Sequence, residues 1–191
     1  MTPSSTRTAP DDEDDDARGP RLSPRPFLVN VAVLRRHAGS RQHEERAGPI
    51  EGLAVSGSRV PPGAEVVVDV VLEAVHGGVM VSGAVTAPWE AECRRCLGPA
   101  QGGLEARVRE LFEPDSDLDE TYRLAGERLD LEPLARDAVL LELPLAALCS
   151  EGCPGLCPTC GANLNQGGCA CPQASADPRW AALDTLRGQV E

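Results

Sequence analysis

The alternation of apolar and polar residues predicts β-strands between residues 26 and 113. The clearest strand is 65–75 (EVVVDVVLEAV), in which every even position is apolar. Its acidic residues also recur every four positions, as on one side of a helix, but its β-branched content favours a strand. Residues 26–34 (PFLVNVAVL) are predicted to form another strand. The polar, arginine-rich residues 35–46 are expected to form a connection.

Two glycines mark a hairpin after the clearest strand. Gly77 and Gly78 separate it from the apolar run 79–86 (VMVSGAVT). Glycine is favoured there because tight hairpin turns need positive φ angles. Residues 104–113 (LEARVRELFE) are predicted to return as the next strand. The three strands would form an antiparallel meander, with the CRRC sequence at 93–96 in its second turn.

Residues 130–143 (DLEPLARDAVLLEL) have the pattern of a helix. Asp130 is placed to cap its start, Pro133 falls in its first turn, and Pro144 ends it. A second, short helix is predicted over residues 177–187 (DPRWAALDTLR), which begin with a capping aspartate and a proline.

Six of the eight cysteines fall between residues 149 and 171. Four of them have the spacing C-x2-C-x8-C-x-C, which is typical of a site for one tetrahedral metal ion. Pro158 and Gly161 favour the turn that aims backbone amides at the sulfurs. These four predicted ligands are Cys157, Cys160, Cys169 and Cys171.

The remaining four cysteines have the spacing C-x2-C…C-x3-C and are candidates for a second site. It would form if the turn of the meander met the segment that follows the central helix. In a rival partition, Cys93 and Cys96 bind a metal together with Cys157 and Cys160, and the spacing leaves both open. The predicted ligands of the second site are Cys93, Cys96, Cys149 and Cys153.

Sites with four thiolates leave no open coordination position, so one or two structural Zn²⁺ ions are expected rather than a catalytic one. The alternative is a zinc-linked thiol redox switch or chaperone, since Arg94 and Arg95 are placed to lower a thiol pKa. No nucleophile is paired with a base, so we predict that the protein is not an enzyme and has no small-molecule substrate.

The pattern as a whole predicts an α+β protein. It would have an antiparallel β meander or barrel-like core with one central helix, a zinc-bound cysteine-rich tail and a short C-terminal helix. The composition of the start, rich in serine, threonine, proline and acids, predicts disorder. The predicted divisions are a disordered acidic tail (1–24), an α+β core domain (25–145), a cysteine-rich zinc-binding segment (146–175) and a C-terminal helix (176–191).

The charge distribution separates one arginine-rich segment from an acidic protein. The net charge is −12, yet residues 21–60 hold seven arginines against three glutamates. There is no lysine, which excludes a P-loop lysine and a pyridoxal phosphate site. Neither a secretory signal nor a membrane span of about 20 apolar residues is evident, so we expect a cytoplasmic protein. The candidate RNA contacts are Arg35, Arg36, Arg41, Arg46, Arg94 and Arg95.

Three stretches together resemble the YceD family of bacterial proteins: ECRRCL, LPLAALCSEGCPGLCPTCGANLN and DPRWAALDTL. The resemblance covers about residues 26–187 and includes the cysteine-rich segment that part of the family has. It implies a non-enzymatic role in accumulation of large-subunit (23S) ribosomal RNA, hence in ribosome biogenesis and assembly of the large subunit. The implied partners are that RNA, a basic large-subunit ribosomal protein, or both.

Overall fold

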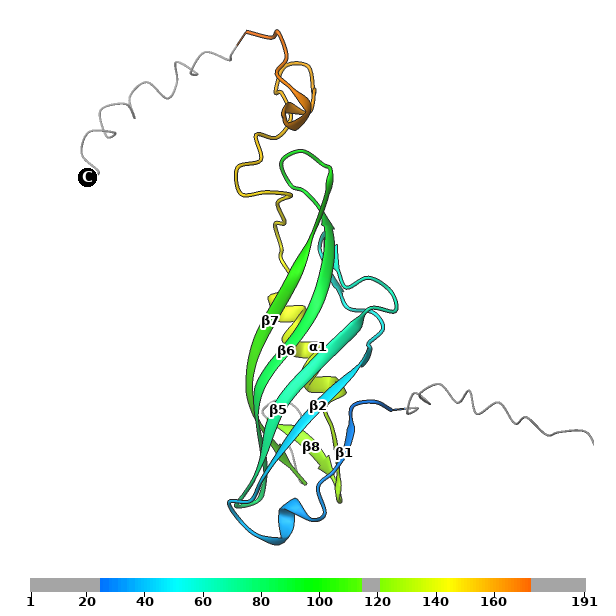
Figure 1. The fold of residues 1–191 in the computed structure, drawn as a ribbon, viewed down its shortest axis with the longest axis vertical. Helices are drawn as coiled ribbons and strands as arrows, with labels where there is room; N and C mark the ends of the chain where they lie inside the picture. Colours follow the sequence, from blue (N-terminus) through cyan, green and yellow to red (C-terminus); the bar gives the residue numbers. More distant parts are fainter. Residues whose placement is uncertain (1–24, 115–120, 173–191) are drawn as a thin grey trace, which may run out of the picture.

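The predicted meander is the centre of the sheet in the computed structural model, which describes residues 25–114 and 121–172 (Figure 1). Strands β5 (Glu65–Val75), β6 (Gly78–Glu92) and β7 (Pro99–Glu113) pair antiparallel in chain order. Val75 pairs with Gly78, so the first turn consists of the two residues between them. The last two strands are longer than predicted and continue to the CRRC turn.

Strand β2 (Arg41–Pro49) corrects the prediction of a connection over residues 35–46. It pairs antiparallel with β5 along its whole length. Its charged residues face partners across the strand: Arg41 forms an ion pair with Glu73 at 3.0 Å, and His43 Nε2 lies 2.6 Å from Asp69 Oδ1. The apolar pattern missed this strand because its inward positions are polar as well: Glu44 is buried and contacts Gln42 and Arg46 on the same strand.

The predicted strand at 26–34 is also shorter in the structure. Only β1 (Leu28–Asn30) is a strand, and a 3-10 helix, η1 (Leu34–Arg36), follows it. The sheet is mixed, since β7 and β8 pair in parallel through Phe112 and Tyr122. Besides β2, the strands that the sequence did not predict are β3 (Ala54–Val55), β4 (Ser58–Arg59), β8 (Tyr122–Ala125) and β9 (Arg128–Asp130).

The described residues are mostly β: a curled half-barrel sheet of nine strands with one α-helix, α1 (Glu132–Glu142). The helix lies against the sheet in Figure 1 and buries the face that carries Leu134, Ala135 and Val139. The even positions of β5 are buried, as the alternation predicted. This agrees with the expected barrel-like core and central helix. The predicted tail at 1–24 and helix at 177–187 lie outside the described residues.

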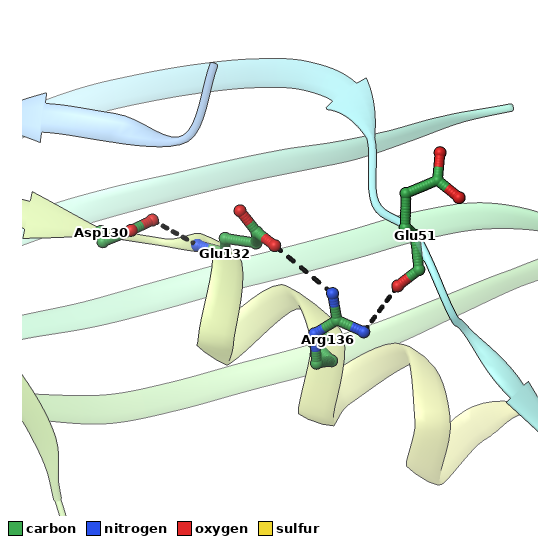
Figure 2. A network of polar contacts seen from close by, with 4 residues as sticks. All are labelled: Glu51, Asp130, Glu132 and Arg136. Carbon is green, nitrogen blue, oxygen red and sulfur yellow. Dashed lines mark hydrogen bonds and ion pairs between the residues drawn. The ribbon is translucent and has the colours of Figure 1, made fainter. Parts of the chain in front are cut away.

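Polar contacts fix both the start of α1 and its position (Figure 2). Asp130 Oδ1 accepts a hydrogen bond from the backbone N–H of Glu132 at 3.0 Å, although the N-cap position itself is Leu131 and has no side-chain capping bond. The predicted aspartate thus satisfies an N–H of the first turn from one residue before the N-cap. Arg136 lies 3.4 Å from the Glu132 carboxylate and donates to the backbone carbonyl of Glu51 at 2.7 Å. The helix is thereby joined to the segment that follows β2. No helix within the two described ranges has the length and apolar character needed to cross a membrane.

Gly83 on β6 leaves no room for a side chain, since an added Cβ would lie 2.7 Å from the Cα of Val70 on β5. We expect Gly83→Ala to lower the free energy of unfolding by about 1–3 kcal/mol, because the two strands would have to separate. Gly103→Ala on β7 is the matched control, since nothing lies within 4 Å of its Cβ position. Urea unfolding measures both, and an equal effect of the two substitutions would contradict this close approach.

Candidate metal centres

The turn between β6 and β7 carries the first pair of cysteines. The backbone N–H of Cys93 donates to the Gly98 carbonyl at 2.7 Å, and the N–H of Leu97 donates to the Cys93 carbonyl at 2.9 Å. Leu97 has a φ of 57°, a left-handed conformation that is uncommon outside glycine. The turn therefore has the tight form that aims Cys93 and Cys96 toward one point.

The segment after α1 is held against this turn by hydrogen bonds. The N–H of Arg94 donates to the Ala147 carbonyl at 3.0 Å, and the N–H of Leu156 donates to the Arg95 carbonyl at 3.1 Å. The guanidinium of Arg95 donates to the carbonyls of Cys153 and Glu151, at 3.0 and 3.3 Å. Arg95 thus secures the chain on which the second pair of cysteines lies.

The first centre consists of Cys93, Cys96, Cys149 and Cys153, whose sulfurs all lie within 4.8 Å of one another. The Cys93–Cys153 and Cys96–Cys149 sulfur pairs are 3.8 and 3.6 Å apart. Four sulfurs at about 2.3 Å from one tetrahedral zinc ion are separated by roughly 3.8 Å, so the spacing fits that ion. Three of the four residues are buried, and Cys149 is exposed.

The second centre consists of Cys157, Cys160, Cys169 and Cys171, again within 4.8 Å of one another. Its first pair lies in a turn in which the N–H of Gly161 donates to the Cys157 carbonyl at 2.9 Å. Gly161 has a φ of 74°, as its predicted role in closing the turn requires. Only Cys157 is buried, so this centre is more open to solvent than the first.

The two groups match the first partition considered from the sequence and not the rival that joined Cys93 and Cys96 to Cys157 and Cys160. All eight cysteines have free thiols. No histidine, aspartate or glutamate joins either group among the residues that the structure describes. Each centre could therefore hold one metal ion with four sulfur ligands and no open position, which suits Zn²⁺ in a structural role.

The electrostatics of the first centre favour a thiolate at Cys93. The backbone N–H groups of Cys149 and Cys96 point at its sulfur and lower its pKa to about 6. The Cys149 thiol donates hydrogen bonds to the sulfurs of Cys153 and Cys96, which raises its pKa to about 12. Without metal, the thiols of this centre therefore do not ionise together at neutral pH.

The second centre likewise contains one thiol with a lowered pKa and one with a raised pKa. The backbone N–H groups of Cys160 and Thr159 lower the pKa of Cys157 to about 6, and the contact from Thr159 is 3.4 Å long. A hydrogen bond with Cys160 is the main reason that the pKa of Cys171 rises to about 12. A metal ion has to displace the protons that remain, so the affinity of both centres is expected to fall as the pH falls.

The six arginines predicted to contact RNA are spread over the molecule. Four of them also bond to protein groups: Arg35 donates to the Gly126 carbonyl at 2.7 Å, and Arg41, Arg46 and Arg95 have acidic or carbonyl partners. Arg36 and Arg94 are exposed, and no side-chain partner is found for them among the described residues. The structure thus places Arg94 on the turn of the first centre and Arg36 in η1, away from the centres.

Sequence reasoning missed one residue of the first centre. Asn165 lies in a 3-10 helix, η2 (Leu164–Gln166), in the loop of the second centre. Its side-chain N–H donates to the sulfur of Cys153 at 3.3 Å and lowers the pKa of that thiol. The only sequence signal was the pair of asparagines in GANLNQGG, which by itself predicts a turn.

Fold and centres together define a small protein with a β half-barrel and two four-cysteine centres beside the end of its longest hairpin. The chain belongs to the YceD family: residues 81–187 match the family described as large ribosomal RNA subunit accumulation protein YceD. The resemblance seen in the sequence is thereby confirmed.

Relatives are found in mycobacteria and plants. An uncharacterized protein of Mycobacterium tuberculosis is 39% identical over 182 residues, which are 86% of each chain. A protein of Zea mays, described as large ribosomal RNA subunit accumulation protein YCED homolog 1, chloroplastic, is 29% identical over 157 residues, covering 64% of this chain and 54% of the relative. The Arabidopsis thaliana protein of the same description is 37% identical over 65 residues, covering 34% and 20%. No solved structure gives a significant match.

Proposed function

We propose that this protein is a non-enzymatic, cytoplasmic factor for accumulation of 23S ribosomal RNA and for assembly of the large ribosomal subunit. The observation that carries the proposal is membership of the YceD family, whose description names accumulation of the large ribosomal RNA subunit. Two plant relatives have the same description. A role without catalysis is supported by centres in which four sulfurs would complete the coordination of zinc.

In this proposal the zinc ions have a structural role. They would fold the cysteine-rich segment, predicted to cover residues 146–175, and hold it beside the β6–β7 turn. The contact between Arg94 and Ala147 and the contacts of Arg95 with Glu151 and Cys153 support this arrangement. The segment and the core domain would then present one continuous surface to a partner.

The proposed partner is large-subunit ribosomal RNA, a basic ribosomal protein of that subunit, or both. An acidic protein of net charge −12 suits a basic protein partner, because opposite charges speed association. The six arginines named above remain the proposed RNA contacts. Arg36 and Arg94 are the best placed of them, since their exposed side chains can reach phosphates without giving up a bond seen in the described residues.

Depletion of the protein from its own cells tests the proposed function. We expect a selective loss of the large ribosomal subunit and its 23S RNA, with the small subunit and its RNA retained. Sedimentation of ribosomal particles, together with quantification of both RNAs, measures this. Expression of the intact chain in the depleted cells should restore the profile. An unchanged profile under complete depletion would contradict the proposal.

A further inference from the structure

The loop of the second centre reaches into the first centre. Residues 161–168 form this loop, which begins after Cys160 and ends before Cys169, so ligands of the second centre close it at both ends. From η2 within the loop, Asn165 Nδ2 lies 3.3 Å from the sulfur of Cys153, a ligand of the first centre. One side chain thus belongs to the loop of one centre and contacts a ligand of the other.

The orientation of the Asn165 amide is fixed by Asn163. Asn163 Oδ1 accepts a hydrogen bond from the backbone N–H of Asn165 at 3.0 Å and from Asn165 Nδ2 at 2.8 Å. The Nδ2 group has two protons, so one is directed to Asn163 and the other to Cys153. The reversed amide would place its oxygen against two acceptors, so Asn165 must act as a donor to the sulfur.

Backbone contacts hold the loop on the residues that join the two centres. The N–H of Leu164 donates to the Gly155 carbonyl at 2.9 Å, and Leu156 forms an isolated β-bridge with Asn163. Gly155 itself has a φ of 81°, and a Cβ there would lie 3.0 Å from the Arg95 carbonyl oxygen. The loop, the joining residues and the turn of the first centre therefore pack as one hydrogen-bonded unit.

The N–H group of Asn165 points its partial positive charge at a negatively charged centre, because four thiolates around one divalent ion carry a net charge of about −2. N–H donors to the sulfurs offset that charge, and such contacts hold a ligand in its binding orientation. Cys153 is only 2% exposed, so water cannot readily replace a lost donor at its sulfur.

Apart from these hydrogen bonds, the loop has no packed core of its own to keep its shape. None of its residues is buried, and it contains Gly161, Gly167 and Gly168. Glycines give the free chain many conformations, so the closed loop depends on the bonds at its ends. An ion held by Cys160 and Cys169 would supply them.

From these contacts we infer that the two metal centres are coupled, with Asn165 as the positioning residue that transmits occupancy of the second centre to Cys153 of the first. The inference rests on the metal binding included in the proposed function. A metal ion in the second centre orders the loop, the loop sets Asn165 against Cys153, and the first centre then holds its own ion more firmly. Occupancy of the second centre thus raises the metal affinity of the first.

The test measures metal release from the full-length protein loaded with Co²⁺, whose sulfur-to-metal absorption bands report four-sulfur coordination directly. Equilibrium competition with a chelator gives the overall affinity of the chain for two ions, because the spectrum follows both centres from the loaded to the metal-free protein. We expect Asn165→Ala to bind two ions still, but with an overall affinity about tenfold or more lower, in the range known for residues that support metal ligands.

Two further variants make the test specific. The double variant Cys169→Ser and Cys171→Ser removes the second centre, and adding Asn165→Ala to it should change the affinity of the remaining centre little, because no ion then orders the loop that carries Asn165. Gln166→Ala is the matched control, because Gln166 is the exposed neighbour in η2 and, among the described residues, only its backbone N–H is bonded, to the Asn163 carbonyl at 3.1 Å. It should leave the affinity of the intact chain unchanged.

The outcomes separate this inference from the proposals on which it rests. Two ions per chain, with an overall affinity that Asn165→Ala leaves unchanged or lowers equally with and without the second centre, would overturn the coupling and leave the metal centres in place. A wild-type chain that binds no metal under reducing conditions would overturn the centres and the coupling together. Neither result depends on the ribosomal profile of depleted cells, which tests the proposed function by itself.

Discussion

Replacement of Cys93 by serine is expected to remove one metal ion per chain and to release the segment after α1 from the β6–β7 turn. A hydroxyl is a poor replacement for a thiolate on zinc, and structural zinc sites contribute about 10–16 kcal/mol of apparent binding free energy that is coupled to folding. Cys93 is fully buried at the centre of this contact. Its loss should therefore unfold the segment and not merely weaken it.

Metal analysis and hydrogen exchange together check this result. The amides of Leu156 and Arg94, which join the segment to the turn, should lose protection, whereas those of β5 and β6 should keep it. Ser150→Ala is the control, since Ser150 lies exposed in the same segment without a sulfur. Full metal content and unchanged protection in the Cys93→Ser protein would refute the assignment of Cys93 as a ligand.

Truncation of Phe112 to alanine is expected to lower the free energy of unfolding by about 3–5 kcal/mol, the usual cost for a fully buried phenylalanine. Phe112 is 1% exposed and stacks on Tyr122 with 5.0 Å between ring centroids. These two residues also form the parallel pairing of β7 with β8. Removal of the Phe112 ring therefore opens a cavity where the strands β8, β9 and β1 join the larger sheet.

Denaturant unfolding measures the free energy of unfolding of Phe112→Ala and of a control variant, Leu141→Ala. Leu141 lies on α1 and is 86% exposed, so its truncation should change stability by less than about 0.5 kcal/mol. Tyr122 adds a polar contact at the same junction, since its hydroxyl donates to Asp137 at 2.9 Å. A cost below about 1 kcal/mol for Phe112→Ala would show that this junction does not limit stability.

The parts of the fold predicted correctly are those whose local pattern matches their burial. Every even position of strand β5 is apolar, and all of these positions are buried. Strand β2 was missed because its inward positions are polar too: Glu44 is buried there and forms an ion pair with Arg46, so no apolar alternation shows in the sequence. The short strands β8 and β9 have too few residues for a pattern to show.

The candidate site was predictable in its residues but not in its arrangement. Thiols in C-x2-C pairs indicate metal binding, and the described structure places all eight cysteines in two groups. The choice between the two partitions depends on whether the β6–β7 turn meets the segment after α1, a tertiary contact to which the spacing of Cys149 and Cys153 gives no clue. The donor Asn165 was hidden for the same reason, because its acceptor, Cys153, belongs to the other group.

The first centre joins residues that are 60 positions apart, Cys93 and Cys153. In a chain that grows from its amino end, the sheet through β7 can leave the ribosome while half of the ligands are still to be made. The centre can then close only when residue 153 has emerged, and the second centre only after Cys171. Metal binding is thus a late step of biosynthesis. A chain truncated after α1 would contain the thiols of Cys93 and Cys96 without the other two ligands of the first centre.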